Sequence, residues 1–167
     1  SRDAFDIEGL GEKQIEQFWQ DGLITDPADL FSLEQRNSDK GIINPPLENR
    51  EGWGNKSIAN LFSAIQRKKF ISLERFIYSL GVRHVGQGTA RLLAKNYLSL
   101  DIFLASMKSA LNKDNDEYFT LENINGIGSK VANALLDFFS ENHNIVIVSE
   151  LNSVVEVQNF VPPLTDS

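Results

Sequence analysis

The amino-acid sequence predicts an all-α fold made of four repeated units, in each of which a glycine turn leads directly into a helix. A Gly-x-Gly motif recurs along the 167-residue chain, and apolar residues follow each copy at helical spacing. Residues 145–155 are rich in β-branched side chains, but no other segment offers a partner strand. We therefore expect a helix there as well.

The four glycine turns begin at residues 9, 52, 84 and 126. Three of them place a lysine two positions after the second glycine. Their shared residues are Gly9, Gly11 and Lys13; Gly52, Gly54 and Lys56; and Gly126, Gly128 and Lys130. The third copy is degenerate, because His84 replaces the first glycine and Gly88 replaces the lysine, while Gly86 is kept.

The segment after each turn carries one apolar stripe. After the last three turns the apolar residues fall at positions i, i+3, i+4 and i+7, which is the buried face of an α-helix. These residues are Ile58, Leu61, Phe62 and Ile65; Ala90, Leu93, Ala94 and Tyr97; and Ala132, Leu135, Leu136 and Phe139. The first copy gives Ile15, Phe18 and Trp19 before Gly22, where we expect its helix to end.

Short helices are expected before the turns as well. Ser72 is a candidate N-cap for residues 73–80, with Gly81 as the C-terminal glycine, and Thr120 is a candidate cap for a brief turn through residues 122–123. The repeating unit is therefore a helix-hairpin-helix. We expect four of these units, arranged as two pairs in a helical bundle.

Further segments connect the units. We expect a helix from Asp26-Pro27 to Leu33, a polar connection over residues 35–51, and a helix over residues 99–111. The expected core residues of the last helix are Ile102, Phe103, Ala105 and Leu111. The expected division is a first pair over residues 1–68, a second pair over residues 69–155, and an outgoing linker over residues 156–167 with Pro162-Pro163.

Charge is unevenly distributed along the chain. The formal net charge is -7, which by itself argues against a nucleic-acid partner. Residues 1–51 hold 12 acidic and 5 basic residues, residues 52–107 hold 2 and 8, and residues 108–167 hold 9 and 3. Charges more than about 10 Å apart are screened at ordinary salt, so the middle third can present a local basic face.

A glycine turn at the start of a helix is suited to bind an anion. Glycine permits positive φ and close approach of the backbone, and the first amides of the following helix have no intrahelical partner. A lysine in the first helical turn adds a charge-assisted contact. We therefore expect phosphate contacts at all four turns, with Arg83, His84, Gly86, Gly88 and Thr89 forming the third and least secure contact.

Other residue types exclude several classes of function. The chain has no Cys, so it forms no disulfide or thiolate metal site, and His143 is the only histidine partner for His84. No signal peptide or membrane span is visible, and we expect a monomer in the cytoplasm, excised from a longer protein. The aromatic residues are expected in the core; only Trp53, in the middle of a turn, is equally compatible with an outward position.

The chain resembles the helix-hairpin-helix region of bacterial NAD-dependent DNA ligases. The resemblance covers nearly the whole chain, and the residues that carry it are Ser-Arg-Asp-Ala-Phe-Asp-Ile-Glu-Gly-Leu-Gly at 1–11, Pro-Ala-Asp-Leu-Phe at 27–31, Arg-Phe-Ile-Tyr-Ser-Leu-Gly-Val-Arg-His-Val-Gly at 75–86, and Gly-Ile-Gly at 126–128. Residues 35–51 are longer than the connection usual in that family, and His84 departs from its glycine pattern.

The resemblance implies sequence-independent binding of nicked duplex DNA across the minor groove, and a parent enzyme that seals nicks in replication and repair. It places NAD, Mg²⁺ and Zn²⁺ in other domains of the parent chain and none of them in this segment. The family's adenylated lysine precedes an Asp-Gly pair. The sole Asp-Gly pair here, Asp21-Gly22, has Trp19 at the lysine position, so the segment itself is expected to be non-catalytic.

Three alternatives compete with this resemblance, and the sequence disfavours the second of them. The chain fits a helix-hairpin-helix module of another repair protein, such as a nuclease subunit or a branch-migration factor. A glycosylase needs a catalytic Asp on a loop beyond the hairpin, whereas Asp137 follows Gly128 too closely. A helical protein-interaction domain is the third alternative. Charge reversal at Lys13, Lys56 and Lys130 separates it from a DNA-binding module.

Overall fold

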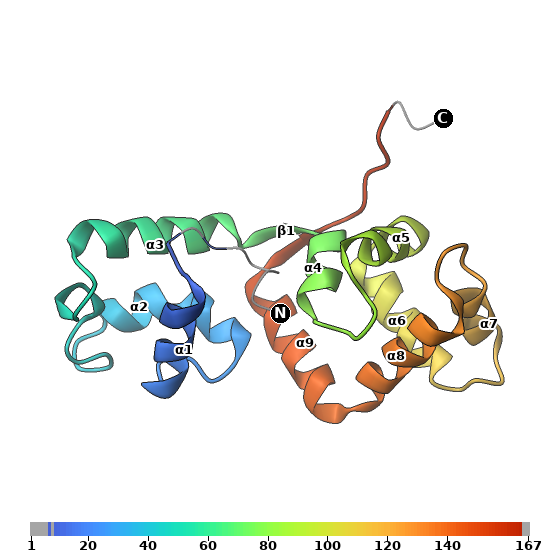
Figure 1. Cartoon of the computed structure of the whole chain (residues 1–167), viewed down its shortest axis with the longest axis horizontal. Coiled ribbons are helices and arrows are strands. Elements are labelled where there is room, and N and C mark those ends of the chain that lie inside the picture. Colours follow the sequence, from blue (N-terminus) through green and yellow to red (C-terminus); the bar gives the residue numbers. More distant parts are fainter. Residues whose placement is uncertain (1–6, 8, 165–167) are drawn as a thin grey trace.

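The computed structural model describes residues 7 and 9–164 and is almost entirely helical (Figure 1). The opening residues of the family resemblance and the last three residues of the expected linker lie outside the described residues. The elements are α1 (Glu12–Gln20), the 3₁₀ helix η1 (Pro27–Ser32), α2 (Leu33–Ser38), the 3₁₀ helix η2 (Leu47–Asn49), α3 (Asn55–Arg67), β1 (Phe70–Ser72), α4 (Leu73–Ser79), α5 (Gln87–Tyr97), α6 (Leu100–Ala110), α7 (Asp116–Glu122), α8 (Gly128–Ser140), α9 (Asn142–Val154) and β2 (Glu156–Gln158). The predicted all-α class is confirmed.

The helices form two groups along the long axis of the molecule. Figure 1 shows α1, α2 and α3 at one end and α4 to α8 at the other, with β1 following α3 between them. Helix α9 returns toward the first group, where it packs against η1. The predicted boundary between residues 68 and 69 falls in the turn between α3 and β1, and the independence of the two pairs stays a prediction.

The apolar stripes after the last three turns form the core, as the helical spacing predicted. All twelve of their residues are buried in α3, α5 and α8. In α1 the stripe is narrower, because Phe18 is buried whereas Trp19 is 44% exposed. The prediction for Trp19 is therefore wrong, since the helix ends one residue later and Gly22, at φ +73, turns the chain away.

Capping residues set several helix starts as predicted. The Ser72 hydroxyl accepts a hydrogen bond from the Arg75 amide, and Gly81 follows α4 with φ +68. The segment after Asp26 begins as expected but is a 3₁₀ helix before it becomes α2. The Asp29 carboxylate accepts hydrogen bonds from the amides of Thr25 and Asp26, at 2.7 and 3.1 Å, which fixes this start.

Two helices in the second group differ from the prediction. Helix α7 begins at Asp116 with Asn115 as its cap, so Thr120 lies inside the helix instead of capping it. In α6 only Phe103 of the four expected core residues is buried, because the buried stripe is Leu100, Phe103, Met107 and Ala110. The predicted set of core residues is wrong because α6 is apolar on more than one face, so its composition alone does not show which face meets the core.

The start of the predicted linker is structured, which corrects that prediction for residues 156–160. Strand β2 pairs with β1 in parallel, with Ile71 opposite Val157. Beyond the strand, the amide of Phe160 donates to the carbonyl oxygen of Leu98 at 2.9 Å, and the Phe160 ring is buried. Strands of three residues carry no readable alternation, and their pairing joins segments more than 80 residues apart in the sequence.

The connection over residues 35–51 is more ordered than its polar composition suggested. It contains the end of α2 and all of η2, and it buries Ile43 and Leu47 in the core. The Asn37 side chain accepts from the Leu47 amide at 2.9 Å and donates to the Glu48 carboxylate at 3.1 Å. Residue 47 is thereby held where η2 can act as the short first helix of the second unit.

Candidate nucleic-acid interface

All four glycine motifs form the same hydrogen-bonded turn. In each, the amide of the middle residue donates to the carbonyl oxygen three residues earlier. The bonds are Leu10 to Ile7 at 3.1 Å, Trp53 to Arg50 at 3.0 Å, Val85 to Val82 at 3.1 Å and Ile127 to Ile124 at 2.9 Å. The repeat seen in the sequence is therefore a repeat of backbone geometry, and it includes the degenerate third copy.

The first position of every turn has positive φ, the region that glycine enters without steric cost. Gly9, Gly52 and Gly126 have φ of +87°, +86° and +93°. His84 occupies the same position with φ +66°, although it carries a side chain. Its backbone therefore reproduces the glycine conformation, and the substitution does not abolish the third turn.

The middle residue of each turn packs against the interior of the molecule. Leu10, Val85 and Ile127 are buried. Trp53 is half-buried and stacks on Phe18, with ring centroids 5.9 Å apart. The two positions left open for Trp53 are thus resolved in favour of packing, and its ring joins α1 to the second turn.

The second glycine opens the helix in the first three units. Gly11, Gly54 and Gly86 are extended N-cap residues, and their carbonyl oxygens accept the first helical hydrogen bonds. The fourth unit differs, because α8 begins at Gly128 itself, which has φ +71°. In every unit the first helical amides remain without intrahelical acceptors and face the turn.

Open space surrounds most of the second glycines. A Cβ placed on Gly54, Gly86 or Gly128 would meet no heavy atom within 4 Å. At Gly11 the same atom would lie 2.7 Å from Oε1 of Gln14. Internal packing therefore does not account for glycine at Gly54 or Gly86, which leaves room there for an external group, whereas the positive φ of Gly128 is itself a reason for glycine.

The charged residues of the predicted site lie on the surface. Lys13, Lys56, Arg83, His84 and Lys130 are all exposed. Gly88 is also exposed and Thr89 is half-buried, both in the first turn of α5. Helix α1 has Glu12 in its first turn, whereas the first turns of α3, α5 and α8 contain no acidic residue.

One groove brings the third and fourth units together. It has a volume of about 580 Å³ and is lined by Gly81, Val82, Arg83, His84, Lys130, Asn133, Ala134, Asp137, Phe138 and Glu141. We call it the Arg83 groove. Three of the predicted residues thus share one surface. The residues missed on α8 continue from Lys130 at helical spacing, a signal that was readable in the sequence.

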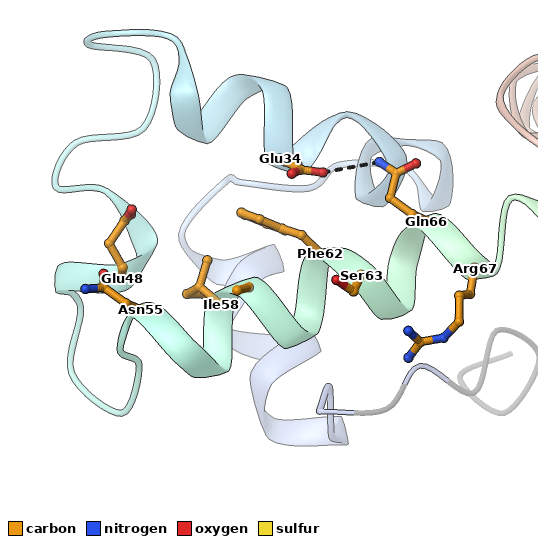
Figure 2. Close-up of a pocket in the computed structure, with 9 residues that line it drawn as sticks. Glu34, Glu48, Asn55, Ile58, Phe62, Ser63, Gln66 and Arg67 are labelled. Atoms are coloured by element: carbon orange, nitrogen blue, oxygen red, sulfur yellow. Dashed lines mark hydrogen bonds between the residues drawn. The ribbon is translucent and has the colours of Figure 1, made fainter.

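The first and second units are joined by other contacts. Arg50, which closes the second turn, lies 3.4 Å from the carboxylate of Asp21 at the end of α1. The groove beside this pair of units, which we call the Glu34 groove, has a volume of about 630 Å³ (Figure 2). Gln66 donates to Glu34 across it at 3.3 Å, and Glu48 lies at its other end. Its carboxylates disfavour an anion there.

The described residues contain neither a membrane-spanning helix nor a cluster of metal ligands. No helix in that part of the chain is both long and apolar enough to span a bilayer. No group of three or more His, Asp and Glu side chains there is arranged to hold a metal ion.

Comparison with known proteins gives two kinds of match. Residues 75–148, which contain the third and fourth turns, match the family described as "Helix-hairpin-helix motif". The chain is 49% identical over 164 residues to a protein named DNA ligase from Rhodospirillum rubrum, covering 98% of this chain and 23% of that protein. It is 45% identical to a DNA ligase from Pelobacter propionicus (98% and 24%) and 41% identical to one from Rickettsia rickettsii (96% and 23%).

These matches agree with the repeated turn and with the resemblance seen in the sequence. The chain spans about a quarter of the length of the curated relatives it matches. The chain is therefore similar, along nearly its whole length, to one segment of proteins named DNA ligase, and its second half carries the helix-hairpin-helix motif.

Proposed function

We propose that the chain binds the sugar-phosphate backbone of duplex DNA without sequence preference, as the helix-hairpin-helix region of an NAD-dependent DNA ligase. The observation that carries this proposal is the common turn geometry, in which the first position has positive φ, together with the open space at the second glycine of the last three turns. Such a turn aims unpaired amides and the positive end of a helix dipole at one external point. Phosphate oxygens are the DNA groups that suit it.

Sequence independence follows from the nature of these contacts. Backbone amides and lysine side chains bind phosphate, and phosphate contacts position a protein on DNA without reading its bases. In this proposal the third and fourth units, whose Arg83 and Lys130 share the Arg83 groove, hold two points of one duplex. The minor groove is the site that the family resemblance implies.

The parent protein is proposed to seal nicks during replication and repair. In that scheme NAD supplies the adenylate, Mg²⁺ and Zn²⁺ bind in other domains, and this segment works as a non-catalytic monomer in the cytoplasm. Asp21-Gly22, with Trp19 in place of the adenylated lysine, is the sequence feature that supports the non-catalytic role.

Binding to nicked and intact duplexes of unrelated sequence tests this proposal. We expect the same affinity for unrelated sequences, and a plot of log affinity against log salt with a negative slope equivalent to roughly four to eight phosphates. Reversal of Lys56 and Lys130 to Glu should abolish binding. A flat salt dependence, or binding that survives both reversals, would contradict the proposal and favour a protein partner.

A further inference from the structure

A second groove adjoins the third turn, between α4 and α5. It has a volume of about 250 Å³ and is lined by Glu74, Arg75, Tyr78, Gln87 and Arg91. We call it the Arg75 groove. Gln87 is the first residue of α5 and directly follows Gly86, so the groove begins where the third turn ends.

The groove is rich in hydrogen-bond donors. Two guanidinium groups, a phenol hydroxyl and a carboxamide line it, against the single carboxylate of Glu74. Arginine is suited to phosphate because its planar guanidinium makes two parallel hydrogen bonds. The lining therefore favours an anionic ligand with several acceptor oxygens.

The balance of charge distinguishes this groove from the other two described above. In the Arg83 groove, two positive side chains are balanced by two negative ones, namely Arg83 and Lys130 by Asp137 and Glu141. The Glu34 groove has one arginine and two glutamates. In the Arg75 groove positive charges outnumber negative ones, and it lies in the segment with 8 basic and 2 acidic residues.

Arg91 is held in place before any ligand binds. Its Nη1 lies 3.3 Å from Oε2 of Glu74, and its guanidinium lies over the Phe160 ring, 5.2 Å from the centroid. Half of the Arg91 side chain is still exposed. Because the guanidinium is already oriented, binding through its free edge costs less side-chain entropy than binding through an unrestrained arginine.

We propose that the Arg75 groove binds a backbone phosphate of DNA, next to the phosphate held by the amides of the third turn. Arg75 and Arg91 make the charge-assisted contacts, and Tyr78 and Gln87 donate neutral hydrogen bonds. This inference rests on the proposed function. It adds a contact made by side chains, whereas the turns act through their backbone.

Arg75→Gln is the sharpest test, because Arg75 is exposed and its removal leaves the Arg91 contacts in place. Affinity for a nicked duplex should fall roughly tenfold at 0.15 M salt, and the slope of log affinity against log salt should fall by about one. Arg75→Lys should keep the slope and lose only part of the affinity. Lys108→Gln, which removes an exposed charge from the last turn of α6, is the matched control.

The outcomes separate the two proposals. If the unsubstituted chain does not bind DNA, both fall. If it binds, and Gly86→Val weakens binding while Arg75→Gln leaves affinity and slope unchanged, only the groove proposal falls. An equal loss for Arg75→Gln and Lys108→Gln overturns it too, because the effect would then be one of general charge. Equal thermal unfolding midpoints for the variants and the unsubstituted chain show that folding is not the cause.

Discussion

The first and third glycine turns differ both in how closely they match the sequence motif and in the charge and space around them. The first turn matches the repeat fully, with Gly9, Gly11 and Lys13, whereas the third has His84 at its first position. Both make the same closing hydrogen bond, at 3.1 Å. The motif therefore specifies the shape of the turn, and a histidine with φ +66° is enough to build it.

The surroundings of the first turn are less favourable to an anion than those of the third. The negatively charged Glu12 follows the first turn at the start of α1, and the Gln14 side chain occupies the space beside Gly11. The third has open space at Gly86 and no acidic residue in the first turn of α5. We infer that the third turn is the stronger phosphate site although its sequence is the weaker match.

The helices that these turns open differ in how much stability they supply. Leu93 in α5 is completely buried, whereas Trp19 in α1 is 44% exposed. Leu93→Ala should lower the free energy of unfolding by about 2–5 kcal/mol, and Trp19→Ala by about 1 kcal/mol or less. Urea unfolding measures both. Equal losses would show that α1 is as firmly packed as α5.

The α5 helix also carries a buried hydroxyl. Burial, with a smaller contribution from the charge of Glu117, raises the pKa of Tyr97 to about 12. Its hydroxyl has no hydrogen-bond partner within the described part of the chain. The unfolded chain releases this proton near its ordinary value of 10, so stability should be lost as pH rises from about 10 to 12, by at most about 2–3 kcal/mol.

Tyr97→Phe removes this ionisation and leaves the ring contact with Phe103, whose centroid is 5.6 Å away. The urea concentration at which the variant unfolds should fall less between pH 9 and pH 11 than that of the unsubstituted chain does. If the two chains lose stability in parallel over this range, Tyr97 is not the group responsible.

A direct test of the unequal turns is a matched pair of glycine substitutions. Gly11 and Gly86 both have φ near -85°, so valine is sterically allowed at either backbone. Gly86→Val should weaken DNA binding tenfold or more, roughly the loss of one hydrogen bond to a charged group, because its side chain blocks the approach of phosphate. Gly11→Val should change binding little. The reverse order, measured by fluorescence anisotropy, would refute the ranking of the turns.

The smallest expected effect concerns Glu12. Glu12→Gln removes a negative charge from the first turn of α1 and should raise DNA affinity by about two- to fivefold at low salt. The gain should disappear at high salt because exposed charges are screened. No change at low salt would mean that the first turn lies away from the DNA.

Much of the fold was predictable because the same helical stripe recurs after three turns. Ile58, Leu93 and Leu135 belong to stripes that the structure buries as expected. The buried face of α6 was not predictable, since its apolar residues lie on several sides, and neither was the three-residue pairing of β1 with β2. Local spacing indicates a helix, but which face is buried depends on neighbours that are distant in sequence.

The candidate site also has parts that could be predicted from the sequence and parts that could not. The glycine turns could be located from spacing alone, and Lys130 and the α8 residues of the Arg83 groove lie at helical intervals. The Arg75 groove could not be foreseen, because it forms only when α4 packs on α5 and Phe160 supports Arg91. This contact joins Phe160, near the end of the chain, to Arg91 in its middle, and no local sequence pattern predicts it.

Backbone amide NMR of the ¹⁵N-labelled chain, titrated with a nicked duplex, tests the central claim most directly. The account predicts that the largest shifts fall on the amides that open α3, α5 and α8, at residues 55–57, 87–89 and 128–130, with smaller shifts at residues 12–14. Shifts confined to the Glu34 groove or to α9, with those amides unmoved, would contradict it.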